Sequence, residues 1–242
     1  RDEFDPSQQL DNFEVANGKP AIPGDNAELE FKFDTESDTN KVKINEDGQA
    51  DFYNLGRIIN VQEGEVLVTK EPATEGTPGK SIKGEEIEPK PGEDITLPAG
   101  KNVEVIEDEE GLKLVSEMEG QASYDGSKVN VDDTHEVNGN VDLSTGNIDF
   151  NGNVIVRGDV KEGMEIDAKG SVEVKGSVYE ADIKSGGQII ISKGFIGSPS
   201  KGVLEAEGNI EVKFIENGTV KTQNDLMVRD AIIHSDIDVG KT

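Results

Sequence analysis

The two histidines are the first residues to consider for catalysis or metal binding, because imidazole is both a general base and a common zinc ligand. His135 and His234 are the only histidines and lie almost a hundred positions apart, and the chain has no cysteine. A zinc site needs three or four ligands, so carboxylates would have to complete it. A Ser/His/Asp triad could be drawn from Ser235, His234 and Asp236, but neighbouring residues of a strand point to opposite faces. We therefore predict no catalytic residue and no zinc site at either histidine.

Clusters of carboxylates are the second candidate, because calcium binds clustered oxygens and glycoside hydrolases use paired acids. Asp132, Asp133 and Glu136 lie close together, and residues 107–110 form a denser acidic run. Neither cluster has the spacing of an EF-hand loop or of the nonapeptide calcium repeat. We predict that both are solvated acidic turns, and that the chain binds no metal and no cofactor.

The charge balance narrows the classes of partner. The 242 residues carry 51 acidic and 24 basic side chains, a formal net charge of −27. Nucleic acids bind through neutralisation of phosphate by Lys and Arg, so they are excluded as partners, and anionic membrane surfaces are repelled in the same way. No apolar run approaches the ~20 residues needed to cross a bilayer, so membrane insertion is not expected. Regularly spaced Val and Ile indicate a folded chain with acidic faces over an aliphatic core.

The elements that would position any site come from an internal repeat in the second half of the chain. Aliphatic residues stand six positions apart without a break from Ile148 to Val178. Six residues per face and three faces per turn predict a three-faced parallel β-helix of about six turns over residues 137–242. The turn length drifts from 18 to 17, 21 and 16 residues, which favours a right-handed coil, and residues 197–202 are interpreted as an excursion at one corner.

Two sets of residues are predicted to shape this coil. The first is the aliphatic ladder, which faces the interior. The second is a set of glycines at the corners, where a positive φ or a close approach of neighbouring turns favours glycine. Gly158, Gly176 and Gly194 stand eighteen apart and are expected to stack at one corner. The structural residues predicted in this way are Val154, Val160, Ile166, Val172 and Val178 in the ladder, and Gly152, Gly158, Gly170, Gly176, Gly187, Gly194 and Gly208 at the corners.

The first half of the chain predicts a different architecture. Residues 1–27 are irregular, and residues 28–136 form a compact all-β domain of short strands, so the whole chain is all-β. A dense Gly/Pro tract over residues 71–92 is expected to form either ordered β-arches or a flexible linker, and residues 107–111 are expected to turn a hairpin. Alternating apolar and polar residues predict strands at 29–33, 41–44, 64–69, 102–106, 112–115 and 128–131.

Three strings of this sequence are distinctive. The first covers residues 61–103 and includes Pro72-Ala-Thr-Glu-Gly-Thr-Pro-Gly and Leu97-Pro-Ala-Gly-Lys-Asn, the second is 139–150, and the third is 231–236. With these strings the chain resembles the flagellar assembly protein A family. The likeness covers most of the chain from about Val15. It implies a bacterial cytoplasmic protein with an all-β domain followed by a β-helix, and it offers no catalytic motif to transfer. It also implies a helical segment ahead of the first strand and a coiled-coil tail, neither of which this sequence contains, so we expect an excised piece of a longer protein.

The resemblance and the lack of a catalytic constellation in the sequence predict a non-enzymatic scaffold or protein-interaction module, linked to flagellar assembly or polar organisation. The resemblance implies protein partners, which include the IIA component of the glucose phosphotransferase system and flagellar or polar factors. Homo-oligomerisation of the full-length protein is expected, because the ends of such a coil carry unpaired backbone groups. Two alternatives stay open: a polysaccharide-binding or -cleaving β-helix protein, and a calcium-dependent envelope module.

Overall fold

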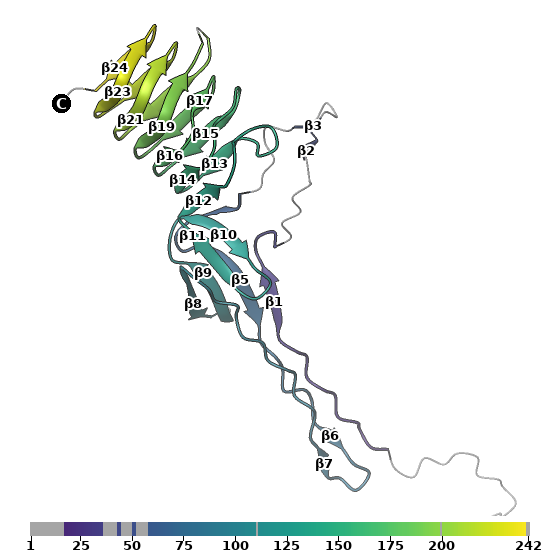
Figure 1. Cartoon of the computed structure of the whole chain (residues 1–242). Helices are drawn as coiled ribbons and strands as arrows, with labels where there is room; N and C mark the ends of the chain where they lie inside the picture. Colours follow the sequence, from purple (N-terminus) through teal and green to yellow (C-terminus); the bar gives the residue numbers. More distant parts are fainter. Residues whose placement is uncertain are drawn as a thin grey trace, which may run out of the picture.

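The computed structural model describes residues 17–35, 43–44, 50–51, 58–109, 111–198 and 200–240. Every regular element in these ranges is a β-strand. The chain forms three parts that follow one another in space: a solenoid of stacked turns, a small β body next to it, and a long thin arm that projects from the body (Figure 1). The all-β fold class and the order of the two architectures are therefore confirmed.

The first face of the solenoid is a six-stranded parallel sheet. Ile148 pairs with Ile166, and Ile166 pairs with Ile183, so equivalent inward residues of successive turns lie directly over one another. Buried and more exposed side chains alternate along every strand of this sheet except the last, because only one side of each strand faces the core. The strands are β13 (Ile148–Phe150), β15 (Glu165–Ala168), β18 (Asp182–Ser185), β20 (Val203–Ala206), β22 (Thr219–Thr222) and β24 (Asp236–Val239).

The second face is a parallel sheet in which Val154 pairs with Val172, and Val172 pairs with Ile189. Its last three strands are longer, because each continues past a bulge at the corner and also covers the third face. The strands are β12 (Thr134–Val137), β14 (Asn153–Val156), β16 (Val172–Val174), β19 (Ile189–Ile196), β21 (Ile210–Glu216) and β23 (Leu226–Ile233).

The third face begins with single bridges that join Val141 to Val160 and Val160 to Val178. From there β17 (Val178–Tyr179) pairs with the second half of β19. The three faces together confirm the three-faced parallel β-helix, because the six-residue ladder supplies one inward residue to each face in turn. Its members are exposed by 2% or less: Ile148, Val154, Val160, Ile166, Val172 and Val178.

Glycines form a hydrogen-bonded column at the corner that leads into the second face. The Gly170 N–H donates to the Gly152 carbonyl at 2.9 Å, the Gly187 N–H to Gly170 at 3.0 Å, and the Gly208 N–H to Gly187 at 2.8 Å. A Cβ on Gly170 would lie 2.8 Å from the Gly152 carbonyl oxygen, well inside van der Waals contact. The backbones of successive turns therefore approach too closely here for any side chain.

A second glycine column lies at the corner between the second and third faces. The Gly176 N–H donates to the Gly158 carbonyl at 3.0 Å, but in the next turn Lys193, and not Gly194, donates to Gly176 at 3.2 Å. Gly194 instead lies against the ring of Phe214, because the bulge shifts the register of β19 against β21. All seven predicted corner glycines have a negative or extended φ, so close approach alone explains them.

The small β body consists of two antiparallel sheets and supplies a second core around Leu67, Val68 and Leu114. All six predicted strands overlap observed strands, and the predicted hairpin is present, with Asp108 paired to Gly111. Lys41 and Val42 of the second predicted strand lie outside the described residues. The sheets are β1 (Glu28–Phe31), β5 (Val66–Glu71), β9 (Gly111–Ser116) and β8 (Val103–Asp108); and β11 (Val129–Asp132), β10 (Gly120–Tyr124) and β4 (Asn60–Val61), with β2 (Lys43–Ile44) and β3 (Ala50–Asp51) as a separate pair.

The arm consists of residues 17–27 and 72–94 (Figure 1). The Gly/Pro tract runs outward, turns at the hairpin of β6 (Gly79–Lys80) and β7 (Glu86–Ile87), and returns to the body. Residues 17–27 lie along it, with bridges from Lys19 to Lys80 and from Ile22 to Thr77. The first parallel strand of the solenoid, β12, begins at Thr134, slightly ahead of the predicted domain boundary.

Candidate interaction surfaces of the solenoid

His135 lies at the junction between the β body and the first turn of the solenoid. Its Nδ1 is 2.9 Å from Oε1 of Gln121 in β10, and its ring lies 5.9 Å from the ring of Phe150. Burial lowers the pKa of His135, because the charged imidazolium loses hydration there. The side chain occupies an inward position of β12 beside Val154, so its role is to close the first turn.

The pH dependence of stability tests the buried role of His135. The lowered pKa of folded His135 means that the unfolded chain, with a histidine pKa near 6.5, binds the proton first as the pH falls. The contribution of His135 to stability is therefore complete above about pH 6.5 and is lost progressively below it. We expect the melting temperature of the wild type to fall relative to that of His135→Gln between pH 7.5 and 5.5, as measured by calorimetry. If the melting temperatures of the two proteins changed equally with pH, this role of His135 would be contradicted.

The other histidine lies in the exposed turn between β23 and β24. His234 has a φ of +46°, and the neighbouring Ser235 hydroxyl donates to the Ile233 carbonyl at 2.8 Å. The same hydroxyl accepts a hydrogen bond from the Gly218 N–H at 3.3 Å, so it ties the last turn to the one before. Ser235, His234 and Asp236 thus form a structural turn.

The acidic residues near the junction take part in local contacts. Glu136 pairs with Arg157 of the next turn, and this guanidinium lowers the pKa of Glu136. Asp133 accepts a hydrogen bond from the Thr134 hydroxyl at 2.9 Å. Within the described ranges, no group of three or more His, Asp or Glu side chains could hold a metal ion.

Asn60 closes the end of the first face, a role that no motif or pattern around this residue indicates. Its Nδ2 donates to the Asp149 carbonyl at 2.8 Å, and its Oδ1 accepts from the Asn151 N–H at 3.1 Å. Asp149 lies in β13 and Asn151 directly follows it, and a preceding turn would otherwise bind these backbone groups. Ile58 packs against the solenoid core beside it, so the β body seals this end of the coil.

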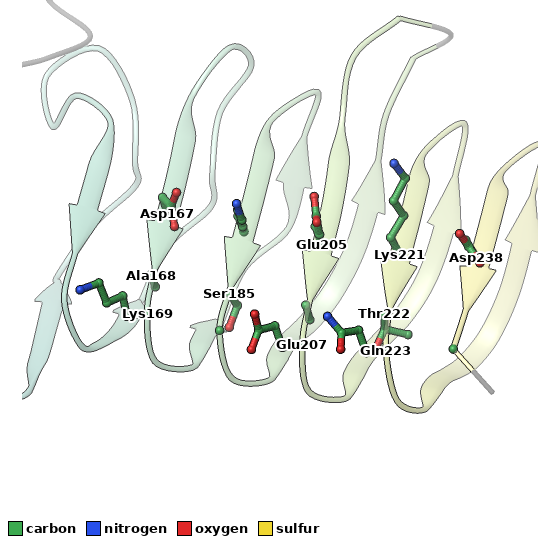
Figure 2. A pocket seen from close by; sticks show the side chains of 14 residues that line it. Asp167, Ala168, Lys169, Ser185, Glu205, Glu207, Lys221, Thr222, Gln223 and Asp238 are labelled. Carbon is green, nitrogen blue, oxygen red and sulfur yellow. The ribbon is translucent and has the colours of Figure 1, made fainter. Parts of the chain in front are cut away.

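A shallow groove of about 840 Å³ crosses the turns on the first face. Figure 2 shows outward side chains of successive strands along it, among them Glu205, Lys221 and Asp238. With Lys184, which pairs in register with Glu205, these residues alternate in charge from turn to turn. The groove is lined by charged, polar and small residues and has no aromatic side chain among them. Its surface can bind a partner of mixed charge, and it offers no stacking platform for a sugar ring.

The second face presents a different outward column. Its residues alternate between glutamate and an aliphatic or Met side chain, in the order Glu136, Ile155, Glu173, Ile190, Glu211 and Met227. Each glutamate has a basic partner in the adjoining column: Arg157 for Glu136, Lys175 for Glu173 and Arg229 for Glu211. Of the apolar side chains between them, Ile155 and Ile190 are half-buried and Met227 is 60% exposed.

The last described turn has the largest apolar exposure of the solenoid. Its residues occupy positions whose equivalents one turn earlier are 0% exposed, namely Ile210, Ile215 and Val220. In the last turn Ile232 is 48% exposed and Ile237 is 38% exposed. Their side chains, with Val239 at 42%, form an apolar end face beside β23 and β24, the last strands of their sheets. We call this surface the end face.

Two family models match the chain and together cover nearly all of it. The Flagellar Assembly Protein A N-terminal region matches residues 2–127, and the Flagellar Assembly Protein A beta solenoid domain matches residues 133–242. Searches of the curated proteins and of the solved structures found no match. The described residues contain no helix that is long and apolar enough to cross a membrane. The solenoid and the strings that suggested it thus agree with the family models, and the chain belongs to the flagellar assembly protein A family.

Proposed function

We propose that this chain is a non-enzymatic cytoplasmic scaffold of flagellar assembly or polar organisation, which binds other proteins and associates with itself. The observation that carries the proposal is the outward surface of the first face, where acidic and basic side chains alternate from turn to turn, as in Lys184, Glu205 and Lys221. Such a column can pair with a protein surface that carries charges of both signs.

The electrostatics support a protein partner. The net charge of −27 repels nucleic acid and anionic lipid, whereas the first and second faces carry interleaved basic and acidic columns that can pair with a protein surface. The proposed partners are the IIA component of a phosphotransferase system and flagellar or polar factors. Isothermal titration with the purified IIA component tests the first of these, and the absence of binding heat at several temperatures would remove it.

Sedimentation velocity of the intact chain tests self-association. We expect the wild type to associate with rising concentration, and we expect Ile232→Glu together with Ile237→Glu to stay monomeric, because two charges on the end face oppose its burial. The matched control is Val105→Glu, since Val105 is 45% exposed on β8, far from the end face. This control should associate like the wild type. A strict monomer at high concentration, or an end-face variant that still associates, would overturn self-association through this surface.

A further inference from the structure

The arm is a bundle of three extended segments whose side chains are buried at every third position. Along residues 17–27 the half-buried or buried positions are Gly18, Ala21, Gly24 and Ala27, and the two residues between each pair are exposed. A β-strand would bury every second residue, whereas a polyproline II helix has three residues per turn. The same spacing recurs in the other two segments, at Ala73, Gly76 and Gly79, and at Pro89 and Gly92.

The hydrogen bonds between the segments repeat with the same period. Lys19 exchanges backbone hydrogen bonds with Lys80, Ile22 exchanges them with Thr77, and the Thr74 N–H donates to the Asp25 carbonyl at 3.0 Å. These contacts advance by three residues on each segment. Toward the third segment, the Gly24 N–H donates to Lys90 and the Ala27 N–H to Glu93, both at 2.9 Å, which is again a step of three. The burial and the hydrogen bonds both repeat with the three-residue period of a polyproline II helix, and the one departure among the positions named above is Gly76, whose φ is +79°.

Glycines make this close packing possible. A Cβ on Gly24 would lie 1.8 Å from the Thr74 carbonyl oxygen, and a Cβ on Gly92 would lie 1.8 Å from the Asp25 carbonyl oxygen. The small residues therefore face the axis of the bundle. Most prolines of the segments are exposed, namely Pro20, Pro23, Pro72, Pro78 and Pro91, whereas Pro89 is half-buried. Pro20 and Pro23 are both exposed and stand three residues apart, so they lie on one ridge of the first segment, beside Ile22, which is 54% exposed.

We propose that this ridge, Pro20 to Pro23, is a preformed ligand for a partner protein with an aromatic-lined groove. Grooves of this kind bind polyproline II segments, because flat aromatic rings pack between prolines that stand one turn apart. The bundle already holds the ridge in the bound conformation, so binding costs little backbone entropy. Lys19 and Lys80 lie together at one end of the ridge and Asp25 lies at the other, so the groove should be acidic toward the lysines. The proposal rests on the protein-binding function proposed above, but it uses a surface separate from the end face.

The test begins with a photo-cross-linking amino acid at position 22 of the full-length protein, in the cell in which it is made. The control position is 87, because Ile87 is also exposed on the arm, at 41%, but belongs to β7. We expect a cross-link at position 22 to a peptide of another protein that contains at least two aromatic residues, and no such cross-link at position 87. The absence of a cross-link above the control, a peptide without aromatic residues, or a peptide from a second copy of this chain would each overturn the proposal.

The purified partner then supplies an affinity measurement. The double variant Pro20→Ala and Pro23→Ala should weaken binding by about tenfold or more, because it removes the apolar ridge and part of its preorganisation. The matched control is Pro91→Ala, which changes an exposed proline of the third segment. The polyproline II signal in circular dichroism verifies that the arm is intact in each variant. Equal affinity of the double variant and the wild type would overturn the proposal, whereas the sedimentation test of the end face is unaffected by these changes.

Discussion

Replacement of Phe195 by alanine is expected to destabilise the solenoid by about 3–5 kcal/mol, the range for removal of a fully buried aromatic side chain. Phe195 is 0% exposed and occupies an inward position of the third face, between Val178 and Ile215 of the neighbouring turns. The surrounding backbone is built for a ring of this size, since a Cβ on Gly218 would lie only 2.3 Å from Cε1 of Phe195. Gly218 has no side chain that could move into the cavity left by alanine, so the loss of stability should be near the upper end of the range.

Urea denaturation followed by far-UV circular dichroism measures this effect. Met227→Ala is the matched control, because Met227 is 60% exposed on the outward side of β23 and also loses a large apolar side chain. We expect the control to change the free energy of unfolding by less than about 0.5 kcal/mol. Similar losses in the two variants would show that Phe195 does not fill the interior in the way described.

Substitution of a corner glycine should have the second largest effect. A Cβ on Gly158 would lie 2.6 Å from the Gly139 carbonyl oxygen and 2.4 Å from Oδ1 of Asn140, and neither turn can move apart without the loss of backbone hydrogen bonds. We expect Gly158→Ala to cost about 2–3 kcal/mol, as for overpacked interiors. For a chain of this size that corresponds to a melting temperature lower by roughly 4–12 °C.

Gly139 provides an unusually close control for this substitution. It belongs to the same column one turn earlier, yet a Cβ there would meet no atom within 4 Å. Gly139→Ala should therefore leave the melting temperature unchanged or raise it slightly, because alanine reduces the entropy of the unfolded chain. Differential scanning calorimetry distinguishes the two variants. If both lowered the melting temperature equally, the close approach of turns would not be the reason for glycine at this corner.

The solenoid could be predicted from sequence because its pattern is local. Each inward residue is set by the alternation within its own strand, and the ladder from Ile148 to Val178 repeats this alternation three times per turn. The stacking of Gly194 was not predictable in the same way. Val174 pairs with Ile191 and Val178 pairs with Phe195, so this turn advances by 17 residues and Lys193, not Gly194, lies over Gly176. The bulge between β19 and β21 then brings Gly194 under Phe214.

The three-residue period of the arm was not predicted from the sequence. Its three segments are separated by up to about seventy positions, and each has too few residues for a period of three to stand out from ordinary Gly/Pro turns. The signal was nevertheless present in Gly18, Ala21, Gly24 and Ala27, and in Ala73, Gly76 and Gly79. The contact of Asn60 with β13 left no such signal, because one polar residue in a loop can bind any backbone that the fold brings to it.

The sealed junction at Asn60 and Ile58 also gives the folding of the solenoid a direction. In a stack where each turn contacts only its neighbours, the first turn has the highest cost, since it closes loops with little surface to pack against. Here the β body supplies that surface, and it precedes the coil in the chain, so it leaves the ribosome first. Each later turn then packs against a neighbouring turn that has already folded. We expect hydrogen exchange to show protection spreading from β12 toward β24 during refolding, with the junction acting as the nucleus.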